Sequence, residues 1–157
     1  KLLGITGETP GARLKEIAEG VRSGRIKALL VFGEDATQAG LNDADLKKLD
    51  LLIAVHILPD ATTKAADFVF PAAGFAEKRG SMINRKGRLQ RLNRAIEPPG
   101  EARDDWEIIR DLILATGGGN GIHAIEDVFR QMAADTPALA GLSLSRIGDL
   151  GVELQLS

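Results

Sequence analysis

Three short, almost wholly apolar runs constrain the fold of this sequence more than any other feature. They occupy residues 26–32, 51–55 and 68–70, and stretches of helical periodicity lie between and around them. A short run with few polar residues is typical of a strand that is covered on both faces, as the strands of parallel sheets are. Strands that alternate with helices pair in parallel through right-handed crossovers. The sequence therefore predicts an α/β fold with a parallel sheet.

The helical segments follow from apolar spacing and from their end signals. Apolar residues recur every three or four positions from Arg13 to Ser23, which predicts one amphipathic helix. Asn42 offers a cap for a short helix. Further helical segments are expected at 62–66, from Asp104 or Asp105 to the glycines at 117–121, and from Ile125 to Pro137.

Composition excludes several kinds of site. The 157 residues are enough for one domain with a real core. There is no cysteine, so this segment holds no disulfide, thiolate nucleophile or cysteine-ligated cluster. His56 and His123 match no metal-ligand spacing. No apolar run approaches the roughly 18 residues of a membrane helix. We predict no metal ligand, no catalytic residue and no direct membrane insertion for this chain.

The loops that follow the predicted strands are the candidate site, because ligands of open parallel sheets bind outside the carboxyl ends of the strands. Gly33 lets backbone N–H groups approach a ligand, and Glu34, Asp35 or Asp60 can accept hydrogen bonds from a ribose or a guanine edge. The alternative is that Gly33 is only a turn and the acids are solvated. His56 is either a base or a donor to a loop carbonyl.

Residues 75–103, here called the basic ribbon, are too polar for a core element and too patterned for a linker. Seven cations and no acid lie within residues 78–94, although the whole chain carries a net charge of −2. We expect a hairpin near 82–93, with Gly80 and Gly87 in turns. The cations suit a solvated face, or docking against an acidic surface or an anionic cofactor. Nucleic-acid binding is not expected, because no aromatic residues are interleaved.

Several motifs occur in one order between about residues 26 and 112. They are Gly33-Glu34-Asp35 after an apolar strand, Asp60-Ala61-Thr62-Thr63, Glu77-Lys78-Arg79-Gly80-Ser81, Gly87-Arg88-Leu89-Gln90 and Pro98-Pro99-Gly100-Glu101-Ala102-Arg103. This order resembles the molybdopterin oxidoreductase superfamily. That superfamily includes formate dehydrogenase alpha chains and the large iron–sulfur subunit of NADH–quinone oxidoreductase, complex I.

The resemblance implies a Rossmann-like third domain that helps to hold one guanosine end of a molybdopterin guanine dinucleotide. The superfamily's iron–sulfur cysteines and metal-ligating residue lie upstream of the matched region, so the chain is expected to be a fragment without activity of its own. The contacts carried over onto this sequence are Gly33, Glu34, Asp35, His56, Thr62 and Thr63.

Two departures from the superfamily pattern favour the complex I branch. Gly33-Glu34-Asp35-Ala36 stands where active members usually show Gly-Glu-Asn-Pro, and Arg79-Gly80-Ser81 stands for the common Asp-Gly-Thr. The first expectation is therefore a domain of an NADH:quinone oxidoreductase subunit, with a structural and docking role and no redox centre. The alternative is the pterin guanine dinucleotide-binding domain of a formate dehydrogenase-like molybdenum or tungsten enzyme.

The resemblance also sets expectations for organisation and partners. Residues 1–116 would form the Rossmann-like domain, and residues 117–157 a C-terminal helix and tail packed on it. The expected partners are the other domains of a parent chain and other oxidoreductase subunits, but not nucleic acid. A cytoplasmic location follows, peripheral on the inner face of the membrane through partner subunits. The outer cations of the basic ribbon are expected to face a domain outside this chain.

Overall fold

A computed structural model describes residues 13–119 and 121–154. The described chain divides into two compact units. Residues 13–74 and 98–105 form what we call the sheet unit, and residues 75–97 and 106–154 form the hairpin unit. The division at residue 116 that the sequence suggested stays a prediction, and each unit is described by itself.

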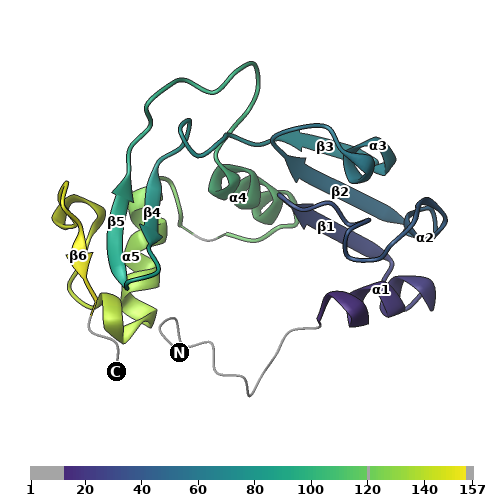
Figure 1. Ribbon diagram of the computed structural model, residues 1–157, viewed down its shortest axis with the longest axis horizontal. Helices are drawn as coiled ribbons and strands as arrows, with labels where there is room; N and C mark the ends of the chain where they lie inside the picture. The colour runs from purple at the N-terminus through teal and green to yellow at the C-terminus, as the bar shows by residue number, and fades with distance from the viewer. Residues whose placement is uncertain (1–12, 120, 155–157) are drawn as a thin grey trace. The chain divides into compact units, whose positions relative to one another are not determined.

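The sheet unit is built on three parallel strands in the order β1-β2-β3 (Figure 1). The strands are β1 (Ala28–Phe32), β2 (Leu51–His56) and β3 (Phe68–Pro71). They coincide with the three apolar runs, so the predicted α/β fold with a parallel sheet is confirmed. The central strand β2 is the most buried, as expected for a strand with neighbours on both edges.

Helices α1 (Leu14–Arg22) and α2 (Asp43–Leu46) supply the core of the sheet unit. Val21 of α1, Leu46 of α2 and Leu52 of β2 lie in one buried cluster. Asp45 of α2 is also buried, and its Oδ2 accepts a hydrogen bond from Arg22 Nε at 3.0 Å. Burial alone would raise the pKa of Asp45, but the Asn42 N–H and the Arg22 guanidinium outweigh it and hold that pKa below its ordinary value.

The end of the basic ribbon returns to the parallel sheet at Arg103. The N–H of Arg103 donates to the carbonyl of Pro71 at 3.1 Å, and the carbonyl of Arg103 accepts from Ala73 at 2.8 Å. These bonds continue the edge of β3 beyond its last residue. The proline-rich connector at 98–100 therefore belongs to the sheet unit, while most of the ribbon does not.

The hairpin unit contains an antiparallel sheet in the order β4-β5-β6. Its strands are β4 (Gly80–Ile83), β5 (Arg88–Leu92) and β6 (Val152–Glu153). The predicted hairpin is confirmed, and Gly87 takes a φ of 80° in its turn. The placement of Gly80 in a turn was wrong, because this residue begins β4 and pairs with Leu92.

The C-terminal segment completes the core of the hairpin unit. Helices α4 (Asp105–Ala115) and α5 (Ile125–Asp135) are followed by the 3₁₀ turns η1 (Pro137–Leu139) and η2 (Leu144–Arg146). One buried cluster joins β5, α5 and the segment after it, and consists of Leu89, Phe129, Ala133, Leu139, Leu144, Ile147 and Leu154. The role of the tail, which the sequence left open, is therefore to close this core.

Four arginines of the basic ribbon form ion pairs with acids of the hairpin unit. The ion pairs are Arg79–Glu126 at 2.7 Å, Arg91–Asp149 at 3.2 Å, Arg94–Glu97 at 3.2 Å and Arg88–Glu153 at 3.6 Å. Three of these acids come from α5 and the C-terminal segment. These ion pairs do not test whether the outer cations face a domain outside the chain, and that expectation stays a prediction. No helix among the described residues is long and apolar enough to span a membrane.

Truncation of Leu139 should destabilise the hairpin unit strongly. Leu139 is 0% exposed, and L139A should cost about 2–5 kcal/mol of unfolding free energy, because it removes buried methyl groups and leaves a cavity. L150A is the control, since Leu150 is 86% exposed and its loss should change stability by about 0.5 kcal/mol or less. Amide hydrogen exchange in α5 and β5 measures both. Equal protection in the two variants would contradict the described core.

Candidate functional site

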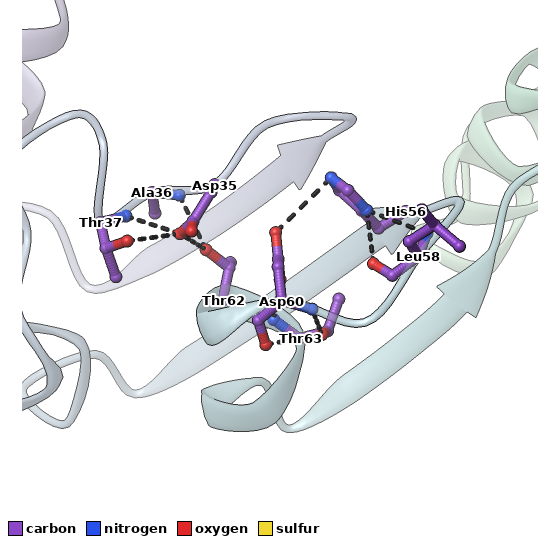
Figure 2. A network of polar contacts seen from close by, with 8 residues as sticks. All are labelled: Asp35, Ala36, Thr37, His56, Leu58, Asp60, Thr62 and Thr63. Atoms are coloured by element: carbon purple, nitrogen blue, oxygen red, sulfur yellow. Dashed lines mark hydrogen bonds and ion pairs between the residues drawn. The ribbon is translucent and has the colours of Figure 1, made fainter.

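The carboxyl ends of β1 and β2 lie at one edge of the parallel sheet, and the loops that follow them carry a polar network (Figure 2). Gly33 leaves β1 with a φ of 67°, and its N–H donates to the carbonyl of Val55 at 2.8 Å. A Cβ placed on Gly33 would meet no atom within 4 Å. The backbone here is therefore open to a ligand, and its conformation favours glycine.

Asp35 is the hub of the network. Its Oδ1 accepts hydrogen bonds from the backbone N–H of Thr37 at 2.9 Å, from the hydroxyl of Thr37 at 2.7 Å and from the hydroxyl of Thr62 at 2.9 Å. Thr62 is 1% exposed, and its oxygen also accepts from the N–H of Ala36 at 2.7 Å. These bonds fix the loop after β1 to helix α3 (Ala61–Ala65).

The same contacts fix the charge of Asp35. The hydroxyl and then the backbone N–H of Thr37 hold the pKa of Asp35 below its ordinary value, and the Thr62 hydroxyl adds to the effect. These donors stabilise the carboxylate form and cannot all be kept when it is protonated. The site therefore presents a negative charge at neutral pH.

Asp60 and Thr63 form a reciprocal cap at the start of α3. Asp60 Oδ1 accepts from the N–H of Thr63 at 2.7 Å, and Thr63 Oγ1 accepts from the N–H of Asp60 at 2.7 Å. The second oxygen, Asp60 Oδ2, is buried and has no hydrogen-bond partner among the described residues. Its ionisable neighbour is His56, whose Nε2 lies 3.5 Å away.

His56 is held by its own loop. Its Nδ1 lies 2.6 Å from the carbonyl of Leu58 and 3.2 Å from the N–H of Leu58, so either tautomer finds a backbone partner. The tautomer with its proton on Nδ1 donates to the Leu58 carbonyl, which is the alternative to a base that the sequence offered. The ring is anchored through one nitrogen, and the other nitrogen faces Asp60 (Figure 2).

The six predicted contacts therefore divide into groups. Asp35 and Thr62 bond directly, while His56 and Thr63 meet through Asp60, which was not among the six. Glu34 is exposed beside the open backbone of Gly33. Asp60 was named from its place after a strand, and it also precedes Thr63 at capping-box spacing. Thr37 was not named, although it follows Asp35 at the spacing of an Asx turn.

Two hollows flank this network within the sheet unit. One of about 330 Å³ is lined mainly by apolar atoms, among them Ile57, Leu58 and Val69, with His56 and Thr63 at its side. Another of about 490 Å³ lies along β1 and α1 and includes Glu34 and Asp35. Carboxylate oxygens beside apolar walls suit a flat ligand that carries N–H and O–H donors.

The charges of the site also indicate which ligand groups it does not suit. The acids at positions 34, 35 and 60 accept hydrogen bonds and repel phosphate groups, and Lys64 is the cation among the residues that line the smaller hollow. The described residues contain no group of three or more His, Asp or Glu side chains that could hold a metal ion. The arrangement therefore suits the nucleoside part of a nucleotide better than its phosphates.

Comparison with known proteins gives a consistent result. The family model for molybdopterin oxidoreductase matches residues 5–115. The chain is 37% identical over 133 residues to F420-dependent formate dehydrogenase 1 subunit alpha of Methanococcus maripaludis, covering 79% of this chain and 19% of that protein. It is also 37% identical over 143 residues to the NADPH-Fe(3+) oxidoreductase subunit alpha of Geobacter sulfurreducens, covering 88% of this chain and 17% of that protein.

The fold has a counterpart among solved structures. Acetylene hydratase from Pelobacter acetylenicus aligns with a TM-score of 0.63 and 19% identity, covering 86% of this chain and 20% of that one. At this identity the likeness concerns the fold alone. The chain thus spans about a fifth of the length of the proteins that it matches.

Removal of the Thr62 hydroxyl should loosen the site. T62V keeps the shape but leaves the buried N–H of Ala36 without an acceptor, which should cost about 1–3 kcal/mol of unfolding free energy. T62S keeps the hydroxyl and should cost about 1 kcal/mol for one lost methyl group. Urea unfolding of both variants measures the difference. A T62S variant less stable than T62V would contradict the bonding described.

Acid should remove the contribution that Asp35 makes to the free energy of unfolding. Its folded pKa lies below the unfolded value of about 3.9, so its contribution is present above about pH 4 and is lost as pH falls through the folded pKa. The stability gap between wild type and D35N should therefore shrink between pH 7 and pH 3 in urea unfolding. D43N, at an exposed acid, is the control. A gap that grows toward pH 3 would reverse the assigned sign.

Proposed function

The chain belongs to the molybdopterin oxidoreductase family, and from that membership we propose that it is the guanosine-binding domain of a formate dehydrogenase-like catalytic chain. The relatives described above carry this choice, since they are named as alpha subunits of a formate dehydrogenase and of an NADPH-Fe(3+) oxidoreductase. They support the formate dehydrogenase-like reading, which the sequence raised as the alternative, better than they support the complex I role. Quinone and NADH find no support in them.

The residues at the strand ends fit the guanosine end of a pterin guanine dinucleotide. Guanine presents N–H donors on one edge and ribose presents hydroxyls, and both need acceptors. Asp60 Oδ2 is a buried acceptor without a hydrogen-bond partner among the described residues. The open backbone at Gly33 leaves room for close approach, because no atom lies within 4 Å of a Cβ placed there.

The proposal gives each residue a distinct task. Asp60 and Glu34 accept hydrogen bonds from the nucleoside. Gly33 has no side chain and so lets the nucleoside approach the backbone closely. Asp35 and Thr62 are positioning residues, because their bonds to each other and to Ala36 hold the loop in place. His56 is a positioning residue for Asp60, since its Nε2 lies 3.5 Å from Asp60 Oδ2.

The parent chain would supply the remainder of the cofactor site. When bound, the molybdopterin cofactor supplies a redox-active metal centre for oxidation of the substrate. The present residues contribute binding and orientation of the nucleotide end, and the exclusion of water from it by apolar walls such as Ile57 and Leu58. Other subunits of the oxidoreductase are the proposed partners, in line with relatives that are themselves named as subunits.

The direct test is binding of GDP, compared with ADP, followed by NMR. GDP should shift the backbone amides of residues 33–37 and 56–63, and ADP should shift them less, because adenine does not present the same donor edge. D60N keeps an N-cap acceptor but replaces the free oxygen by a donor, so it should weaken GDP binding by about tenfold or more.

D43N is the matched control for this test, since it removes one acid at an exposed helix start in the same unit. It should bind GDP as the wild type does. Equal shifts with GDP and ADP, or equal binding by D60N and wild type, would contradict the proposed guanosine site.

A further inference from the structure

The hairpin unit holds a pocket of its own between the β4–β5 hairpin, α5 and the segment at 142–145. Its volume is about 230 Å³, below the roughly 300–1,000 Å³ of pockets that take drug-sized ligands. Its polar lining consists of Arg79, Arg91, Glu126, Arg130, Ser143 and Ser145. Three guanidinium groups thus face one carboxylate around a space suited to a small ligand.

Arg91 and Arg130 keep hydrogen-bond donors beyond those used in their ion pairs. Arg91 binds Asp149 through Nη2, and its Nε is buried without a hydrogen-bond partner among the described residues. Arg130 binds Asp127 through Nη2 alone in the bonds that the structure describes. Each guanidinium carries five N–H donors. A buried donor such as Arg91 Nε requires an acceptor, and none of its described neighbours supplies one.

Each of these arginines is paired with one acid, but only one of the three acids lines the pocket. Asp127 and Asp149 do not line it, and Glu126 is occupied by Arg79 at 2.7 Å. The hydroxyls of Ser143 and Ser145 lie 3.0 Å apart, so one donates to the other and the second O–H can turn to a ligand. Phe129, Leu142 and Leu144 form apolar walls, which strengthen the interaction of charges at their side.

From this arrangement we infer that the pocket binds a small tetrahedral oxyanion of the phosphate or sulfate class. Guanidinium groups bind such anions through paired N–H donors, and serine hydroxyls complete the coordination. The pocket shares no residue with the strand-end loops of the sheet unit, so it is a separate site from the proposed guanosine site. Its cations all come from the basic ribbon and from α5.

The test is titration of the chain with inorganic phosphate and with sulfate, at constant ionic strength set by chloride. Binding should appear in the amide shifts of residues 79, 91, 126–130 and 142–145, with Kd on the order of 1 mM. R91Q and R130Q should each weaken binding by about tenfold or more, because each removes a charged donor set. Their ion pairs are exposed on one side, so both variants should stay folded.

Two further variants distinguish a built pocket from general attraction to positive charge. R85Q removes a cation from the same ribbon at an exposed turn position outside the pocket, and should leave binding unchanged. E126Q removes the one lining carboxylate, and should tighten binding by about threefold or more. The inference is overturned if chloride competes as well as sulfate, if R85Q weakens binding as R91Q does, or if E126Q weakens it.

Discussion

The hydrogen bond between Thr62 and Asp35 is the contact on which the site depends. It joins the loop after β1 to the start of α3, two segments that are 27 residues apart in the sequence. The Thr62 oxygen has a second task, because it accepts the buried N–H of Ala36. Together with the bond from the Gly33 N–H to the Val55 carbonyl, it holds the open backbone at Gly33 near the start of α3. The parallel order of β1 and β2 brings the two loops to one edge of the sheet.

Much of the sheet unit could be predicted from the sequence, because the pattern of a buried parallel strand is local. Residues 26–32, 51–55 and 68–70 lack the alternation of a half-exposed strand, and the structure places a strand of one parallel sheet in each. Among the described residues only β2 is largely buried, so the expectation of strands covered on both faces was wrong for β1 and β3. The helix boundaries near Arg13 and Asn42 were similarly local. The candidate site was partly predictable for the same reason, since loops that follow parallel strands must meet at one edge.

The hairpin unit could not be predicted in the same way. Its core joins Leu89 of β5 to Leu139 and Leu154, and contacts over such separations leave no periodic signal in the sequence. The acids that pair with three of the ribbon's arginines lie 47–65 residues away in the sequence, as Arg79–Glu126 and Arg88–Glu153 show, so no local pattern revealed these pairs. A count of charges along the sequence therefore did not reveal that the fold pairs these arginines with acids from distant segments.

The central claim is that this domain binds the guanosine end of a molybdopterin cofactor through acceptors at the ends of β1 and β2. The most direct measurement is the guanine nucleotide released by acid hydrolysis from the purified full-length parent protein, in wild-type and D60N forms. The account predicts nucleotide in at least stoichiometric amount with the wild-type chain and a marked loss in D60N. A folded wild-type parent that releases no guanine nucleotide would contradict it.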